Sequence, residues 1–195
     1  MARKVFYSFH FERDAWRAGQ VRNCDVVANE DEYGVIDGVE WEKIERQGEE
    51  AVKRWINEQL KNTSVTVVLI GAETSERKWV KYEIKKSLER GNGFVGLRIH
   101  SIKTQDQQTD STGKNPLDDV MTNDGKLLST IYKTYDWEID NGRKNLGLWV
   151  EEAFQNGKLK DEIRLDNTSI PIARPTLASS QPTIIQNPPK PWVTN

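Results

Sequence analysis

The stretch Ser64-Val65-Thr66-Val67-Val68-Leu69-Ile70-Gly71 decides the fold that this chain is expected to adopt. Its apolar side chains are nearly continuous, as is typical of a strand that is buried on both faces of a parallel sheet. Such a sheet needs helices on both faces, because neither face is polar enough to remain in water. The sequence therefore predicts an α/β domain with a mainly parallel sheet.

Two amphipathic segments flank this strand along the chain. Residues 49–62 carry apolar side chains at helical spacing, namely Ala51, Val52, Trp55, Ile56 and Leu60. After the strand, residues 75–90 repeat an apolar side chain at every fourth position, at Val80, Ile84 and Leu88. We expect Thr74 or Ser75 to cap the start of this second helix and Gly91 to end it.

Weaker patterns complete an alternation of strands and helices. Further strands are expected at residues 4–9, 33–37, 94–99 and 130–137. Gly38 is expected to end the second of these strands. Residues 11–23 should be partly helical, with Trp16 and Val21 available for packing, and residues 145–154 should form a last helix. This order predicts a flavodoxin-like three-layer fold, in which helices cover both faces of the sheet.

The end of the chain differs in composition from the rest. Only 36% of the 195 residues are apolar and 30% are charged, so part of the length is expected outside the core. We place one domain at residues 1–160 and an extended or disordered tail at residues 161–195. Most of the prolines lie in that tail, at Pro171, Pro175, Pro182, Pro188, Pro189 and Pro191. The alternative is an arm that packs on its own domain or on a second copy of the chain.

The charge and composition exclude some classes of partner. The net charge is −2 and acidic and basic residues are interspersed, so we expect no binding to nucleic acid or to an anionic membrane. No apolar run approaches the ~20 residues of a membrane-spanning helix. Cys24 is the single cysteine, which fits a reducing, cytoplasmic location. With only two histidines, His10 and His100, we do not expect a metal site.

The ends of two predicted strands mark the place where a ligand is expected. Ligands of open parallel sheets bind beyond the carboxyl ends of the strands. The first strand ends at Ser8-Phe9-His10, and the helix that carries Glu83 begins just after the central strand. We expect Ser8, His10 and Glu83 to share one mouth if these two strands are neighbours. The chain has neither a Walker-type glycine loop nor a Gly-x-Gly-x-x-Gly motif after the first strand.

Glu83 occupies an unusual place on its predicted helix. At ~100° per residue it projects between Trp79 and Val80, beside the apolar stripe. A carboxylate in that position is costly unless another group pairs with it or the protein uses it. One interpretation is a structural acid that favours the helix dipole or bridges to Lys86 or Arg90. The other is a functional carboxylate.

Several motifs resemble those of a known family, the TIR domains. Val5-Phe6-Tyr7-Ser8-Phe9 is similar to their opening strand, and Ser75 followed by Trp79-Val80-x-x-Glu83 resembles their helix signature, with Val80 and Ile84 in place of Cys and Leu. Within TIR domains, the chain resembles the TIR-like proteins of the bacterial Thoeris anti-phage system. Features that appear in both are Arg22-Asn23, residues 62–66, residues 69–71, residues 79–84 and residues 135–137. The resemblance covers roughly residues 3–150 and leaves out the proline-rich tail.

The resemblance implies an activity and a set of partners. TIR enzymes cleave the nicotinamide–ribose bond of NAD, which is their substrate and not a cofactor, and Glu83 occupies their catalytic position. Thoeris TIR proteins respond to a phage-derived trigger by making a cyclic ADP-ribose isomer, which activates a separate effector protein. TIR enzymes commonly assemble, which implies a possible homo-oligomer. A non-catalytic sensor or scaffold that recognises a phage component remains the alternative, followed by a flavin-binding flavodoxin-like module.

The resemblance also implies candidate substrate-binding residues, which are Ser8, Phe9, His10, Asn23, Asp37 and Trp79. Ser8 is expected to contact a ribose or phosphate, or else to make a local backbone hydrogen bond. His10 either lines the pocket or is an exposed loop residue. Asp37 lies where TIR proteins carry a mobile loop, although the usual Gly-Pro pair of that loop is missing here.

Side chains after the first strand have similar open roles. Tyr7, Phe9, Phe11 or Trp41 could form a stacking wall, or else belong to the core. Arg17, Arg22 and Asn23 could meet the pyrophosphate of the substrate, or else form a solvated helix face.

Overall fold

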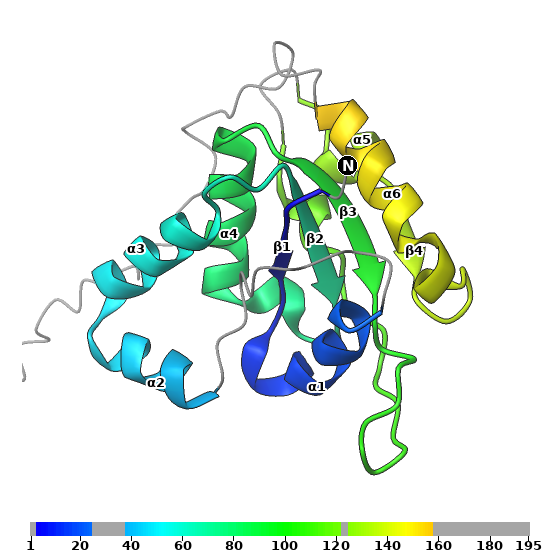
Figure 1. Ribbon diagram of the computed structural model, residues 1–195, viewed down its shortest axis with the longest axis horizontal. Coiled ribbons are helices and arrows are strands. Elements are labelled where there is room, and N and C mark those ends of the chain that lie inside the picture. Colours follow the sequence, from blue (N-terminus) through cyan, green and yellow to red (C-terminus); the bar gives the residue numbers. More distant parts are fainter. Residues whose placement is uncertain (1–2, 25–37, 122–124, 158–195) are drawn as a thin grey trace, which may run out of the picture.

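The computed structural model describes residues 3–24, 38–121 and 125–157. Within these ranges the strands form a parallel sheet in the order β1-β2-β3-β4 (Figure 1). Their bounds are Val5–Ser8 for β1, Val65–Ile70 for β2, Gly93–Arg98 for β3 and Thr134–Asp136 for β4. The predicted α/β class and parallel sheet are confirmed. The expected strand at 33–37 and the tail at 161–195 lie outside the described residues.

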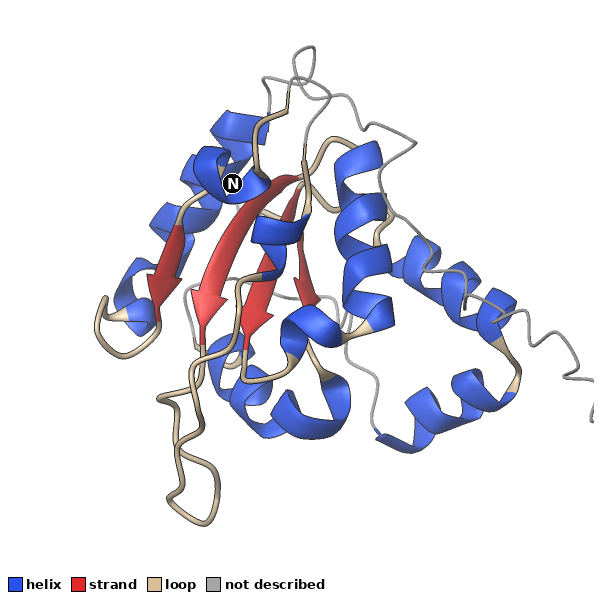
Figure 2. Ribbon diagram, turned by 180° about the vertical axis from the view of Figure 1, so that it is seen from behind, coloured by secondary structure: helices blue, strands red, loops and turns tan. Residues whose placement is uncertain are grey.

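Helices cover both faces of the described sheet, as Figure 2 shows. The α-helices are α1 Phe11–Arg22, α2 Gly38–Arg46, α3 Glu49–Gln59, α4 Lys78–Glu89, α5 Leu128–Ile131 and α6 Gly142–Gly157. Two short 3₁₀ helices, η1 Thr74–Glu76 and η2 Pro116–Asp119, connect them to the strands. None of the helices in these ranges is both long and apolar enough to cross a lipid bilayer.

The central strand β2 explains the layers. All six of its residues are buried, and alternate side chains point to opposite faces of the sheet. Val65, Val67 and Leu69 pack in the cluster that contains α1 and α6, whereas Val68 and Ile70 pack against α4. The near-continuous apolar run of the sequence thus serves two cores, one on each side of the sheet.

The register of the strands places β1 beside β2. They pair in parallel, with Ser8 opposite Val68, so their carboxyl ends meet at one edge of the sheet. Helix α1 begins at this edge after β1, and η1 and α4 follow β2 there. The structure therefore confirms that β1 and β2 are neighbours, which was the condition for a ligand-binding mouth shared by residues from both strand ends.

Helix α2 is a difference from the sequence prediction. No helix was predicted at residues 38–46, whereas Gly38 is the first residue of α2; whether a strand precedes it lies outside the described residues. Trp41 and Ile44 of this helix pack against the cluster that α3 forms with Phe6 of β1. Their spacing of three residues places both side chains on one face of a helix. That face packs on the apolar surface of α3.

Two boundaries and the packing of one side chain also differ from the prediction. The expected strand at 130–137 is divided between α5 and a shorter β4. Helix α4 begins at Lys78, after the 3₁₀ helix η1, and its N-cap is Arg77, so neither Thr74 nor Ser75 caps it as expected. The Thr74 hydroxyl instead accepts a hydrogen bond from the Gly71 amide at 2.9 Å. Trp16 is 47% exposed, so the prediction that it packs is wrong, whereas Val21 is completely buried.

Candidate active site

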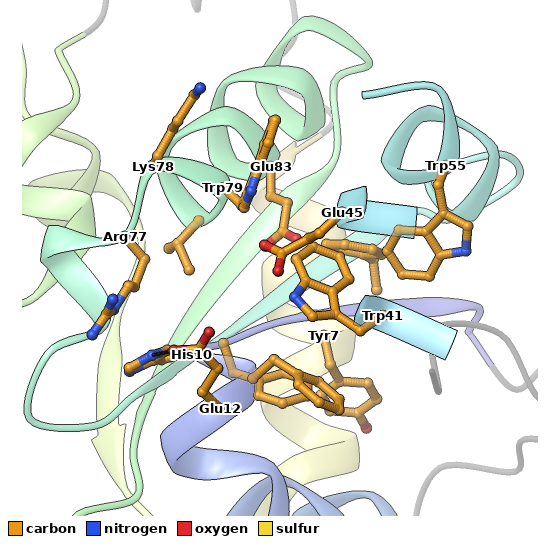
Figure 3. Close-up of a pocket in the computed structure, with 14 residues that line it drawn as sticks. Tyr7, His10, Glu12, Trp41, Glu45, Trp55, Arg77, Lys78, Trp79 and Glu83 are labelled. Carbon is orange, nitrogen blue, oxygen red and sulfur yellow. Dashed lines mark hydrogen bonds and ion pairs between the residues drawn. The ribbon is translucent and has the colours of Figure 1, made fainter. Parts of the chain in front are cut away.

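A cavity of about 200 Å³ lies at the edge of the sheet where β1 and β2 end (Figure 3). Residues from β1, from the start of α1, from α2 and α3, and from the start of α4 line it. Figure 3 shows basic side chains on one side of the cavity and aromatic rings on the other. Glu83 lies between these two sides.

Glu83 is a buried carboxylate, with 7% of its surface exposed. Its Oε2 accepts a hydrogen bond from the Ser8 hydroxyl at 2.6 Å. Burial raises the pKa of Glu83 from its ordinary value of 4.5 to about 8, and the hydrogen bond from Ser8 opposes part of that rise. This raised pKa favours the protonated form of Glu83 when no positive charge lies nearby.

The bridge from Glu83 to Lys86 or Arg90, considered from the sequence, is not formed. Lys86 instead pairs with Glu89 at 2.6 Å, and Arg90 donates to the carbonyl oxygen of Asn57 at 3.0 Å. The apolar stripe of α4 docks on the sheet through Val80 and Ile84, which turns Glu83 towards β1. The helix packing therefore directs this acid into the cavity.

Ser8 is completely buried at the end of β1. Its hydroxyl donates to Glu83 and not to a nearby backbone group, and its contact with a ribose or phosphate stays a prediction. Parallel pairing of β1 with β2 brings these two residues together across 75 positions of sequence.

His10 is buried as well, with 7% of its side chain exposed, so the expectation of an exposed loop histidine is wrong. It lines the cavity and is the N-cap residue of α1. Its Nε2 lies 3.4 Å from Oε2 of Glu12. Among the described residues its Nδ1 has no hydrogen-bond partner, and the Glu73 carboxylate is 3.9 Å away.

Aromatic rings form the opposite wall of the cavity. The Phe9 and Phe11 ring centres are 6.0 Å apart, and Phe11 stacks on Trp41 at 6.1 Å. Trp55 of α3 meets Trp41 edge to face at 5.8 Å. Phe9, Phe11 and Trp41 were candidates for such a wall, whereas Trp55 was predicted only as a core position of its helix. Trp79 borders the cavity from α4.

Comparison with known proteins now decides the family. Residues 6–104 match the family described as "Thoeris protein ThsB, TIR-like domain". The chain belongs to this family of TIR-like proteins. A protein of Bacillus cereus (strain MSX-D12), named "Putative cyclic ADP-D-ribose synthase ThsB1", is 35% identical over 191 residues. That alignment covers 77% of this chain and 100% of the relative.

Two arginines that were candidates for substrate contacts lie elsewhere in this TIR-like protein. Arg17 is buried and donates to the carbonyl oxygen of Ile102 at 2.9 Å. Arg22 lies against the Tyr7 ring, with its guanidinium carbon 5.9 Å from the ring centre. Neither lines the cavity, so the prediction that they meet a pyrophosphate there is not supported.

Two other candidate substrate-binding residues, Asn23 and Asp37, are not found among the described residues that line the cavity. Asn23 is the C-cap of α1, whereas the opposite end of that helix borders the cavity. Its predicted substrate contact gains no support from this placement. Asp37 lies outside the described residues, so its role stays a prediction.

Sequence reasoning missed four charged residues that line the cavity. Arg77 and Lys78 stand at the start of α4, Glu12 in the first turn of α1, and Glu45 on α2. A signal for the first two was present, because a basic pair directly precedes the Trp79 motif. No signal in the sequence pointed to Glu45, because α2 itself was not predicted.

Proposed function

We propose that this chain is an NAD-processing enzyme of Thoeris anti-phage defence, which cleaves the nicotinamide–ribose bond and forms a cyclic ADP-ribose isomer. One observation carries the proposal: a buried carboxylate, Glu83, is held by Ser8 beside an aromatic cavity. The name of the Bacillus cereus relative, a cyclic ADP-D-ribose synthase, supports the same reaction.

The charge of the substrate suits the site. The nicotinamide ring of NAD is cationic, and a nearby positive charge favours the ionised form of a carboxyl group. Substrate binding therefore lowers the raised pKa of Glu83 and converts it to the carboxylate. Ser8 occupies Oε2 of that carboxylate, which leaves Oε1 for the substrate.

Bond cleavage then places positive charge on the ribose. The bond between the anomeric carbon and the nicotinamide nitrogen breaks, nicotinamide departs with the electron pair, and an oxocarbenium-like sugar remains. The Glu83 carboxylate stabilises this cation in a site where water does not screen the interaction. Because nicotinamide leaves as a neutral molecule, no acid is needed to protonate it.

The aromatic wall favours ring closure over hydrolysis. A hydroxyl oxygen of the adenosine half attacks the anomeric carbon and transfers its proton to the Glu83 carboxylate, which gives the cyclic product. Rings such as Phe11 and Trp41 exclude water from this step and restrict the position of the adenosine half. The same oxocarbenium ion would give linear ADP-ribose if water reached it first.

The proposed biological setting follows from the family. The cyclic product activates a separate effector protein, and a phage-derived trigger starts its synthesis. Assembly of several copies of this chain is part of the proposal, since assembly commonly completes the pocket of TIR enzymes.

The test is product analysis with a matched pair of variants. Protein is incubated with NAD, with and without lysate from infected cells, and the products are identified by mass. We expect Glu83→Gln to abolish NAD consumption and to retain the circular dichroism spectrum of the parent. Glu89→Gln makes the same change on an outer position of α4 and should leave the activity intact.

Two outcomes would contradict the proposal. If Glu83→Gln consumes NAD at the parental rate, Glu83 is not the catalytic residue. If no trigger causes NAD loss and cells that carry Glu83→Gln remain protected against phage, the chain acts as a sensor or scaffold.

A further inference from the structure

We infer that the hydrogen bond between Thr66 of β2 and Ser87 of α4 positions Glu83 for the proposed reaction. The inference rests on the proposed function, in which the Glu83 carboxylate must meet the charge that develops on the ribose. Thr66 and Ser87 are not among the described residues that line the cavity. They are positioning residues, because they act through the place of α4 on the sheet and not through contact with the substrate.

Thr66 and Ser87 form a polar contact within an apolar interface. Both side chains are completely buried, and the Thr66 hydroxyl donates to Oγ of Ser87 at 2.7 Å. Around this contact, α4 packs on the sheet through Val80, Ile84 and Leu88. Apolar packing is non-directional, whereas a hydrogen bond requires a defined length and angle. The hydroxyl pair therefore selects one seat for the helix among those that apolar packing alone would tolerate.

The contact repeats the Ser8–Glu83 hydrogen bond one step further from the cavity. Ser87 follows Glu83 by four residues, which is about 6 Å along α4 and on the same side of the helix. On the sheet, Ser8 pairs with Val68, two residues beyond Thr66, and two residues of a strand span about 6.6 Å. Because these two spans nearly match, both hydrogen bonds form together, at 2.6 and 2.7 Å. Helix α4 is thus attached to the sheet at two points, one of which is Glu83 itself.

A chain of hydrogen bonds holds the Thr66 hydroxyl in place. The side-chain amide of Asn92 donates to Oγ1 of Thr66 at 3.2 Å and to Oγ1 of Thr63 at 2.9 Å. The Thr63 hydroxyl donates in turn to the carbonyl oxygen of Leu60, the C-cap of α3, at 2.9 Å. The backbone amide of Asn92 also donates to the carbonyl oxygen of Ser87 at 3.0 Å. A buried polar network whose members are all paired makes a core rigid and specifies one arrangement.

Three variants remove the Thr66–Ser87 contact in different ways. Thr66→Val removes the hydroxyl and keeps the shape of the side chain, whereas Ser87→Ala removes the acceptor. The double variant removes both polar groups, and the Asn92 amide keeps its bond to Thr63, so its stability should remain close to that of the parent. Thr66→Ser keeps the hydroxyl and should retain parental activity.

The kinetic test compares kcat with KM for NAD consumption. We expect Thr66→Val, Ser87→Ala and the double variant each to lower kcat about tenfold and to change KM by less than about twofold. Glu83 acts on charge that appears only during bond cleavage, so its displacement weakens stabilisation of the transition state and not binding of NAD. Thr134→Val is the matched control on β4, where the hydroxyl accepts from Asn115 at 3.0 Å, and it should leave both constants unchanged.

A second measurement needs no turnover. The carboxyl carbon of Glu83 is followed by NMR through a pH titration, and Glu83→Gln identifies its signal. The hydrogen bond from Ser8 lowers the pKa of Glu83, so a displaced carboxylate should titrate at higher pH in Thr66→Val than in the parent. In a Ser8→Ala background, Thr66→Val should cause no further rise, because the contact that it disturbs is already gone. These variants leave in place the other titratable residues that line the cavity, namely Tyr7, His10, Glu12, Glu45, Arg77 and Lys78.

The possible results separate the two proposals. If the double variant keeps the parental kcat, or if Glu83 titrates in it as in the parent, the positioning role is wrong and the proposed function stands. A loss of kcat of the same size in Thr134→Val would also overturn the positioning role, since any loosening of the sheet would then suffice. If the Glu83 titration shifts as expected while no trigger causes NAD loss, the positioning role stands and the proposed function is wrong.

Discussion

Ser8 and Glu83 show how one hydrogen bond adjusts an acid. The serine hydroxyl stabilises the ionised form of Glu83 and so lowers its pKa, while burial raises the pKa to about 8. The net effect favours the protonated acid, and a nearby positive charge would favour the carboxylate. This balance belongs to two side chains, and a single substitution disturbs it.

Replacement of Ser8 by alanine should shift the pH dependence of NAD cleavage. Without the hydroxyl, the pKa of Glu83 rises further, so the acidic limb of the kcat/KM profile should move upward by about one pH unit. Activity at neutral pH should then fall by about tenfold. Initial rates measured across a pH series check this. Ser101→Ala, outside the cavity, should leave the profile in place, and an unshifted profile for Ser8→Ala would contradict the expectation.

At the scale of elements, the site depends on helix α2. This helix supplies Trp41 and Glu45 to the cavity, and it rests on α3 through Trp41 and Ile44. Trp41 joins two elements at once, because it stacks on Phe11 of α1 and meets Trp55 of α3 edge to face. The wall that excludes water is therefore built from separate helices.

Trp41→Ala should change the product of the reaction more than its rate. Opening the aromatic wall admits water to the oxocarbenium ion, so the ratio of linear to cyclic product should rise several-fold. Mass analysis of the products gives this ratio directly. Trp16→Ala removes the same side chain from an exposed face of α1, and its product ratio should match that of the parent.

The junction of β2 with α1 makes a prediction about stability. A Cβ atom at Gly71 would lie 2.2 Å from Oδ2 of Asp14, a completely buried side chain. Gly71→Ala should therefore lower the free energy of unfolding by about 1–3 kcal/mol or more, as measured by denaturant titration.

Gly19 offers the matched control for this substitution. It lies inside helix α1, and an added Cβ would meet no atom of the described residues within 4 Å. Gly19→Ala should stabilise the protein by about 0.5–1 kcal/mol, because alanine favours the helix. If both variants change stability in the same direction, the proposed clash with Asp14 is not the cause.

At the scale of the whole molecule, the buried carboxyl group of Glu83 costs stability. Between its unfolded pKa near 4.5 and its folded pKa of about 8, Glu83 holds a proton in the folded state that the unfolded state releases. The folded state thus binds more protons in this window, and stability falls as the pH rises through it. Above about pH 8, Glu83 is ionised in the folded state too, and the free-energy cost of burying its charge reduces stability in full.

Glu83→Gln should remove this dependence. The variant should gain stability relative to the parent as the pH rises from about 5 to about 9, by on the order of a few kcal/mol. Denaturant unfolding at a series of pH values, without ligand, measures the difference. Equal slopes for parent and variant would show that Glu83 titrates at its ordinary pKa.

Much of the architecture could be predicted from the sequence because it depends on local patterns. The apolar run of β2 indicated a strand buried on both faces, and the stripe of Val80, Ile84 and Leu88 indicated the face of α4 that packs. Given that face, the position of Glu83 beside it followed from helix geometry. The part of the family motif from Trp79 to Glu83 could be read for the same reason, since these residues lie within one helix.

Only the tertiary structure decided which distant residues meet. The Ser8–Glu83 hydrogen bond depends on β1 lying beside β2, and the burial of His10 depends on the elements that surround it. Helix α2 and the two cations at the start of α4 entered the site only when neighbouring elements packed around the cavity. The physical reason is that periodicity encodes the environment of a residue along its own element, whereas pairing across the chain is set by how whole faces pack.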